Sequence, residues 1–249
     1  APDGHLLGHV GEGNRKDIRN AVEAAEKAVA WSRTTGHNRA QILYYVAENL
    51  DARAGEFAAR IDAMTGEAGG TAEVEAAIRR LFTWAAWADK HDGAAKGVPM
   101  RGLALALHEP VGVIGALCPA EAPLLGLVTA MGPALAAGNR VVLVPSEPFP
   151  LAATDFYQVL DTSDVPAGAV NIVTGTPGAL APVLAAHAAV GAVWNLADSA
   201  LTADIEAQSA DTLKRSWEMR TDWRAPPAES RAFLRAATEV KTVWVPYGE

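Results

Sequence analysis

Four short apolar runs, separated by segments of helical length, constrain the fold of this chain most strongly. The runs cover residues 111–117, 140–144, 169–173 and 190–196. The helical segments that fit between them cover residues 123–137, 151–160 and 177–187. Strands that are apolar without alternation are covered on both faces, and strands joined through helices run parallel. We therefore predict an α/β chain with a doubly wound, Rossmann-like parallel sheet that has helices on both faces.

The first third of the chain is predicted to be helical. Apolar residues recur at helical spacing after Asn14, a residue type that caps helices well. Further amphipathic segments follow at about 38–51, 57–66 and 71–93. Residues 103–107 then alternate Leu with Ala, which is the period of a strand.

The alternation of strands and helices is predicted to stop at Asp198. Residues 201–224 are mostly polar and contain two isolated tryptophans, and a short helix restarts after Pro226. Residues 240–245 have high β propensity and predict a last strand, with no hairpin partner beside it in the sequence.

Charge and cysteine content argue against several classes of function. The chain has 21 Lys and Arg against 29 Asp and Glu, a net charge of −8, whereas binding nucleic acid or an anionic membrane needs clustered positive charge. Its one cysteine, Cys118, forms no internal disulfide and no Cys-rich metal site, which favours a reducing, cytoplasmic compartment. The apolar stretch 122–137 is interrupted by Gly and Pro and predicts a buried helix. The chain begins at Ala1 without a basic and apolar leader, so we expect no signal peptide and a piece of a longer polypeptide.

Several segments carry a resemblance to a known family. Residues 109–115 are Glu-Pro-Val-Gly-Val-Ile-Gly, residues 141–147 are Val-Val-Leu-Val-Pro-Ser-Glu, and residues 165–175 are Val-Pro-Ala-Gly-Ala-Val-Asn-Ile-Val-Thr-Gly. Together with residues 239–245 and the N-terminal helices, they resemble the aldehyde dehydrogenase superfamily. The chain is most similar to the degenerate, truncated second module of the tandem aldehyde dehydrogenases. Each piece alone would be weak, but the combination is specific.

The resemblance implies chemistry for which this chain lacks the groups. In the family a Cys thiolate attacks the aldehyde, a hydride passes to a nicotinamide, and a carboxylate activates water. The family carries that Cys and that Glu downstream of the matched region, the Cys in a separate catalytic domain. About forty residues separate Asp198 from the last strand, too few for another domain, and no Glu-Leu-Gly-Gly or Gly-Gln-x-Cys segment is present. We therefore predict no catalytic residue in this chain.

Two residues at the place of the family's Pro-Trp-Asn segment have side chains that can take part in catalysis. Cys118 has no basic neighbour in the sequence and is predicted to be a small buried hydrophobe. Glu121 replaces the Asn whose amide would donate to the developing oxyanion, and an ionised carboxylate cannot donate. We interpret Glu121 as a solvated acid near a helix start, with a general base as the alternative.

The family's cofactor site is predicted to be eroded. Val144 stands in the place of the Lys that contacts the adenosine ribose, and Asp198 ends the loop that would otherwise carry Phe-Thr-Gly-Ser against the pyrophosphate. Glu147, Pro166 and Gly168 remain as vestigial positions, interpreted as turn and cap residues kept for folding. We expect no cofactor on this chain, with a weak nucleotide site as the alternative, and NAD for the parent enzyme. The six histidines predict no metal site.

The sequence therefore predicts an aldehyde-dehydrogenase-like domain at 1–198, a short replacement for the catalytic domain at 199–237, and an oligomerisation strand at 238–249. The predicted function is structural: a catalytically silent module in an NAD-dependent aldehyde dehydrogenase. The alternatives are an active NAD(P)-dependent oxidoreductase that borrows groups from another module, and a nucleotide-sensing regulatory domain.

The predicted partner is a complete aldehyde dehydrogenase module, in the same polypeptide or in a second subunit. It would be contacted through Val240, Thr242 and Trp244 of the last strand. The resemblance implies that this strand adds to the catalytic-domain sheet of a neighbour. The alternative is that the strand folds back or frays.

Overall fold

Helices form the N-terminal part of the computed structural model, which describes residues 1–99 and 101–247. They are α1 (Arg15–Lys27), α2 (Ala30–Arg33), α3 (Gly36–Ala52), α4 (Ala54–Thr65) and α5 (Gly70–Trp87). Asn14 caps α1 as predicted, accepting from Lys16 N at 2.8 Å, while Asp17 accepts from Asn14 N at 2.9 Å in a capping box. The helix that the sequence extends to about residue 93 ends at Trp87, because the next residues turn into a strand, β1 (Gly93–Lys96).

A five-stranded sheet forms the centre of the molecule, with the strand order β5-β4-β3-β6-β7 and every neighbouring pair parallel. Its strands are β3 (Val113–Leu117), β4 (Arg140–Val144), β5 (Val170–Ile172), β6 (Ala192–Asn195) and β7 (Arg215–Glu218). The intervening helices are α6 (Pro123–Ala136), α7 (Leu151–Asp161), α8 (Pro177–Ala186), η1 (Ser199–Leu201) and α9 (Thr202–Ala210). The predicted Rossmann-like α/β fold is confirmed.

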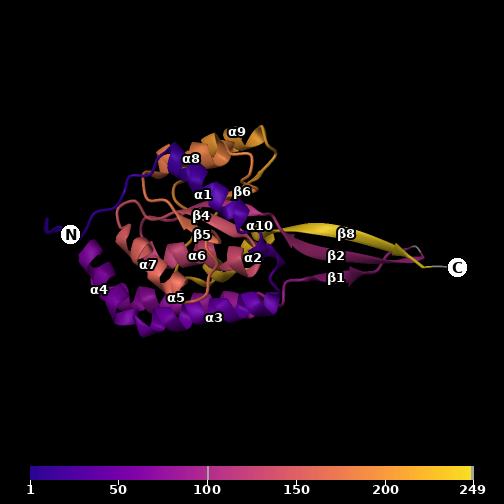
Figure 1. Cartoon of the computed structure of the whole chain (residues 1–249), viewed down its shortest axis with the longest axis horizontal. Helices are drawn as coiled ribbons and strands as arrows, with labels where there is room; N and C mark the ends of the chain where they lie inside the picture. The colour runs from indigo at the N-terminus through magenta and orange to yellow at the C-terminus, as the bar shows by residue number, and fades with distance from the viewer. Residues whose placement is uncertain (100, 248–249) are drawn as a thin grey trace.

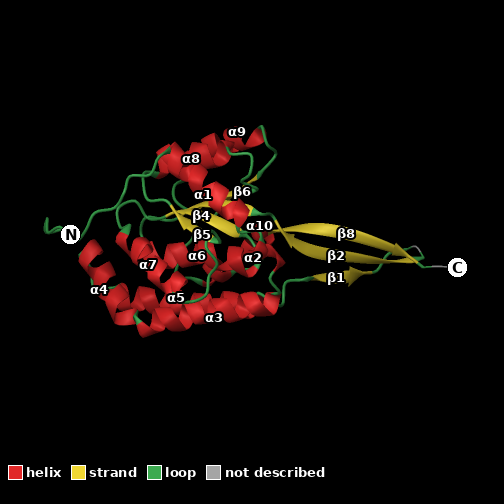
Figure 2. Ribbon diagram, viewed as in Figure 1, coloured by secondary structure: helices red, strands yellow, loops and turns green. Residues whose placement is uncertain are grey.

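Both faces of the sheet are covered, and alternate residues of each strand enter different cores. Val141 and Leu143 of β4 belong to the core under α3 to α7, whereas Val142 and Val144 belong to the core under α1 and α8. Figures 1 and 2 show these two groups of helices on opposite sides of the sheet. This double burial explains why the strands are apolar without alternation.

The expectation that the alternation stops at Asp198 is wrong, because α9 and β7 continue it. β7 pairs in parallel with β6 and forms one edge of the sheet. Its sequence, Arg-Ser-Trp-Glu, is half-exposed and polar, so it lacks the apolar run that marks a central strand. Its tryptophan is not isolated, because the Trp217 ring lies 5.2 Å from that of Trp194 and 4.9 Å from that of Phe233, edge to face in both cases.

A second sheet forms an arm that projects from the body (Figure 1). It is antiparallel, with the order β1-β2-β8, where β2 covers Gly102–Pro110 and β8 covers Thr238–Pro246. The last strand has no hairpin neighbour, as expected, and pairs instead with a strand that is distant in the sequence: β8 pairs with β2 from Pro110↔Thr238 at the root of the arm to Gly102↔Pro246 at its tip. Of the predicted oligomerisation strand 238–249, residues 248 and 249 lie outside the described residues.

The segment between β7 and β8 contains η2 (Pro226–Glu229) and α10 (Ala232–Ala237), close to the predicted short helix. Phe233 and Leu234 of α10 are buried in the core shared with α5 and α6. Within the described residues, no helix combines the length and the apolar composition that a membrane span requires.

Candidate functional site

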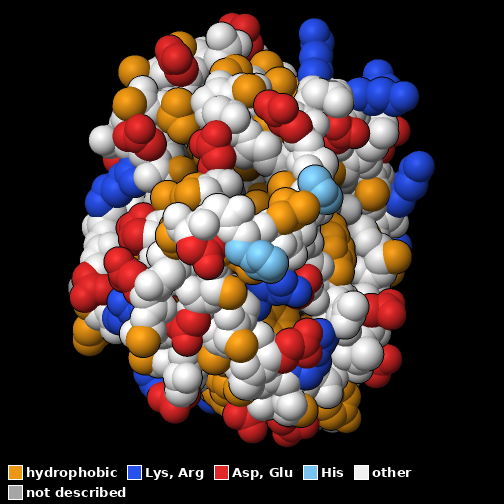
Figure 3. Space-filling model, turned by 90° about the vertical axis from the view of Figure 1, so that its left-hand side faces the viewer, with side chains coloured by type: hydrophobic (Ala, Val, Ile, Leu, Met, Phe, Trp, Pro, Cys, Tyr) orange, Lys and Arg blue, Asp and Glu red, His pale blue; other side chains and the backbone are white. Residues whose placement is uncertain are grey.

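β3 begins near the root of the arm, where β2 ends. Because the other strands of the central sheet are parallel to β3, their carboxyl ends all lie at the end of the body opposite the arm (Figure 2). The strand order reverses direction around β3, and open α/β sheets bind ligands at such switch points. Acidic side chains are spread over this end of the molecule in Figure 3. The loops after β3, β4, β6 and β7 therefore form the candidate site.

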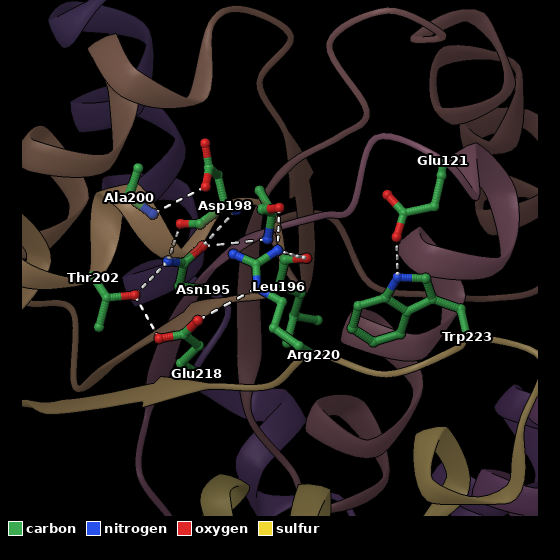
Figure 4. Close-up of polar contacts among 10 residues, drawn as sticks. Glu121, Asn195, Leu196, Asp198, Ala200, Thr202, Glu218, Arg220 and Trp223 are labelled. Atoms are coloured by element: carbon green, nitrogen blue, oxygen red, sulfur yellow. Dashed lines mark hydrogen bonds and ion pairs between the residues drawn. The ribbon is translucent and has the colours of Figure 1, made fainter.

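The loop after β6 satisfies its own backbone N–H groups (Figure 4). Asn195 Oδ1 accepts from Ala197 N at 3.2 Å and from Asp198 N at 3.3 Å. Asp198 Oδ1 accepts from Ala200 N at 2.9 Å and so caps η1, which leads directly into α9. A phosphate bound at a helix N-terminus uses free N–H groups of this kind. Here a carboxylate of the chain occupies that position.

A polar network connects this loop to the end of β7 (Figure 4). Asn195 Nδ2 donates to Thr202 Oγ1 at 3.0 Å, and Thr202 Oγ1 donates to Glu218 Oε2 at 2.7 Å. The other carboxylate oxygen, Glu218 Oε1, accepts from Arg220 Nε at 3.3 Å. Arg220 also donates to the backbone oxygen of Ala197. Both oxygens of Glu218 are therefore engaged.

Sequence reasoning missed Glu218 because it missed β7. The available signal was the pattern Trp-Glu-Met near the end of the polar stretch, too short to distinguish from a loop. The structure brings Glu218 beside Asn195, whereas Glu121 lies farther along the same edge and makes a different contact (Figure 4).

The loop after β3 is held from two sides. Ser146 Oγ donates to Ala120 O at 2.8 Å, and Trp223 Nε1 donates to Glu121 Oε1 at 2.8 Å. Glu121 is exposed, as a solvated acid would be, but it also has this specific partner, which the sequence did not predict. Trp223 is buried in the core and is not isolated, contrary to the expectation.

A second carboxylate that the sequence did not single out occupies the N-terminus of α6. Glu73 of α5 is buried, and its Oε1 accepts from Leu124 N at 2.9 Å and from Leu125 N at 3.1 Å. Its Oε2 lies 3.9 Å from Arg224 Nη2. Burial raises the pKa of Glu73 above its ordinary value, and the two backbone hydrogen bonds oppose this shift.

Comparison with known proteins identifies the fold and its lineage. Residues 1–218 match the sequence profile of the aldehyde dehydrogenase family. The chain belongs to the aldehyde dehydrogenase family. The match runs past Asp198 and ends at Glu218, the last residue of β7.

Relatives in this family are longer than the chain. An aldehyde dehydrogenase of Agaricus bisporus is 34% identical over 194 residues, which cover 74% of this chain and 38% of that protein. The 2-hydroxymuconic semialdehyde dehydrogenase of Pseudomonas putida is 37% identical over 187 residues, which cover 71% of this chain and 38% of that protein. The chain thus spans well under half the length of these relatives.

Solved structures give the same result. An apo indole-3-acetaldehyde dehydrogenase superposes with a TM-score of 0.83 at 30% identity, covering 88% of this chain and 52% of that one. PnpE in complex with nicotinamide adenine dinucleotide gives a TM-score of 0.83 at 29% identity, covering 86% of this chain and 45% of that one.

Cys118 is a buried hydrophobe, as predicted from its position beside the family's Pro-Trp-Asn segment. It is buried, and burial raises the pKa of its thiol to about 12. Its backbone N donates to Val144 O at 2.8 Å, as part of the loop that leaves β3. A thiol with this pKa is not a thiolate near neutral pH, so it is a poor nucleophile.

The three positions interpreted from the sequence as vestigial all make contacts within the chain. Glu147 Oε1 accepts from Thr176 Oγ1 at 3.0 Å, beside the start of α8. Pro166 O accepts from Ala169 N at 3.0 Å in a turn. Gly168 has a φ of +84°, and a Cβ there would lie 2.4 Å from the backbone oxygen of Ala24.

Val144, in the place of the family's ribose-contacting Lys, is completely buried in the core under α1 and α8. Its side chain contributes to packing and offers no polar atom to a ligand. Among the residues that the structure describes, no group of three or more His, Cys, Asp or Glu side chains is placed to hold a metal ion.

Proposed function

We propose that this chain is a catalytically silent module of an NAD-linked aldehyde dehydrogenase, with a role in assembly. The observation that carries the proposal is the pair of carboxylates at the carboxyl edge of the sheet. Glu73 occupies the N-terminus of α6, and Asp198 occupies that of η1, which leads into α9. A dinucleotide pyrophosphate needs free N–H groups at such a position, and like charge repels it.

The groups available for chemistry support the same proposal. Aldehyde oxidation in this family begins with a thiolate, and the thiol of Cys118 is buried with a pKa of about 12. A general base needs a carboxylate oxygen free to approach water, and both oxygens of Glu218 are engaged by Thr202 and Arg220.

The proposed assembly role rests on the arm. β8 pairs with β2 along one edge, and within the described residues no strand pairs with its other edge. Val240 and Trp244 expose 60% and 52% of their surface, and Thr242 between them is also exposed. An unpaired edge with apolar side chains is a template for strand addition. The proposed partner is a complete aldehyde dehydrogenase module that receives this edge.

Calorimetric titration of the whole chain with NAD tests the cofactor part of this proposal. We expect a Kd much weaker than about 1 μM, which corresponds to about −8 kcal/mol. Asp198→Ser removes the carboxylate from the helix start and should strengthen any residual binding. The control Asp211→Ser removes the same charge from an exposed position at the opposite end of α9 and should have little effect. A wild-type Kd of micromolar or tighter would support the nucleotide-sensing alternative.

A turnover assay with NAD and NADP tests the catalytic part. No oxidation of simple aldehydes is expected from wild-type chain or from Cys118→Ala. Turnover that the Cys118→Ala substitution abolishes would make Cys118 a nucleophile and overturn the proposal.

A further inference from the structure

Two imidazole rings stack at the root of the arm, where the arm leaves the body. The rings of His91 and His108 are 3.9 Å apart between centroids, with 3° between their planes. His91 lies in the loop between α5 and β1, and His108 lies on β2. The stack thus joins the last helix of the N-terminal layer to the central strand of the arm.

Hydrogen bonds around the stack connect it to β8, the third strand of the arm. Thr238, the first residue of β8, donates its hydroxyl proton to Leu234 O at 2.8 Å. The contact of 3.3 Å between His91 Nε2 and Thr238 Oγ1 therefore has the imidazole as donor. The carbonyl oxygen of Thr238 accepts from Arg215 Nη1 at 2.6 Å, and His108 N donates to Asp92 O at 3.1 Å.

The other ring of the stack, His108, is half-buried. Its Nδ1 is buried and has no hydrogen-bond partner within the described residues. A positive charge on His91 would therefore lie face to face with this ring in a region that is largely shielded from water.

The charged and titratable groups that face the pair come from its own loop, from α3 and from the segment around α10: Asp89, Asp92, His37, Arg39, Arg231 and Arg235. Burial, followed by the charges of His108 and Arg231, holds the pKa of His91 below its ordinary value. Asp92 opposes this shift and Arg235 adds to it.

We propose that the His91–His108 stack is a proton-sensitive latch that fixes the arm to the body while the His91 ring is neutral and releases it when that ring is protonated. The latch lies at the arm root, so it does not depend on what binds to the outer edge of β8. A cavity of about 320 Å³ beside the pair, lined also by Trp87, Leu234 and Thr238, gives a charged ring space to leave the stack.

The direction of the pH effect follows from the lowered pKa of His91. Because the pKa of His91 is lower in the closed chain than in the opened one, opening takes up protons on acidification. The closed stack is therefore at its full stability above about pH 6.5, the ordinary pKa of histidine, and loses stability as the pH falls below it.

Hydrogen–deuterium exchange of the full chain, corrected for the intrinsic rate at each pH, measures this release. Between about pH 7.5 and pH 5.5, protection of β2 and β8 should fall by about tenfold relative to β3 and β4, because an opening step that takes up one proton shifts by up to about tenfold per pH unit. His91→Phe keeps an aromatic ring but cannot be charged, so this difference should disappear. The control His9→Phe, at an exposed residue far from the arm in sequence, should keep it.

Equal protection of the arm at both pH values, or an unchanged fall in His91→Phe, would overturn the latch. Proton NMR of the wild-type chain is a second test of the latch that needs no variant. The His91 imidazole should titrate below the ordinary histidine pKa of about 6.5. A His91 titration at or above that value would also overturn the proposal.

Discussion

The indole nitrogen of Trp223 donates to the carboxylate of Glu121 at 2.8 Å, across 102 residues of the chain. This bond fastens the segment after β7 onto the loop after β3. The same segment contributes buried Ala228, Phe233 and Leu234 to the core. In this way the residues that follow the family match add apolar side chains to the core that includes α5 and α6.

Trp223→Phe should destabilise the chain, because it removes the donor to Glu121 and part of a buried ring. We expect a loss of about 1–3 kcal/mol in the free energy of unfolding, measured by chemical denaturation. The matched variant Glu121→Gln still presents a side-chain oxygen that can accept from the indole. Its loss in free energy of unfolding should therefore be smaller. A Trp223→Phe chain as stable as wild type would show that the segment is only loosely attached.

Gly168→Ala should be destabilising for a reason of backbone geometry. The residue has a φ of +84°, and its new Cβ would lie 2.4 Å from the backbone oxygen of Ala24, which cannot rotate away. A cost of at least about 1–3 kcal/mol is expected from thermal or chemical unfolding. Gly55→Ala is the control, because a Cβ there meets nothing within 4 Å and the residue lies in α4. It should be neutral or slightly stabilising.

Glu73 should make the chain's stability fall as the pH rises through its titration. Burial raises its pKa in the folded state, so the folded chain binds its proton more tightly than the unfolded chain does. The penalty of the buried charge appears above about pH 4.3, the ordinary pKa of Glu, and is complete above the raised folded value.

Glu73→Gln removes this titration and retains an acceptor for Leu124 N and Leu125 N. The free energy of unfolding of the variant, relative to wild type, should therefore rise between pH 4 and pH 7 in denaturant titrations. Glu75→Gln changes an exposed residue of the same helix and should give a difference that is nearly constant with pH. A constant difference for Glu73→Gln as well would contradict the predicted shift.

Association with a complete aldehyde dehydrogenase module should depend on the exposed side chains of β8. The double variant Val240→Lys and Trp244→Lys places charges on the proposed docking strand, as natural edge strands do to prevent pairing. Sedimentation velocity with the complete module should show affinity weakened by about tenfold or more, or about 1.4 kcal/mol. Leu213→Lys changes an exposed apolar residue outside the arm and should leave the affinity unchanged. If the double variant associates as tightly as wild type, the arm is not the dock.

The elements that could be predicted from the sequence are those whose burial is complete or whose partners lie close by in the chain. β3, β4 and β6 are buried along their whole length, and their apolar runs can be recognised without knowing the partner strand. Likewise the sequence predicts that Val144 and Asp198 are poor cofactor ligands, because the resemblance gives their positions and residue type decides whether a side chain donates, accepts or repels.

The other elements and contacts could be described only from the tertiary structure, because they depend on packing between segments that are distant in the sequence. β7 is a polar edge strand, and β8 finds β2 more than a hundred residues earlier in the chain, as Pro110↔Thr238 illustrates. Local propensity does not specify such a pairing, since it depends on the position of the other strand. The carboxylate of Glu73 at α6 and the stacking of His91 on His108 likewise exist only when helices and strands from different parts of the sequence pack together.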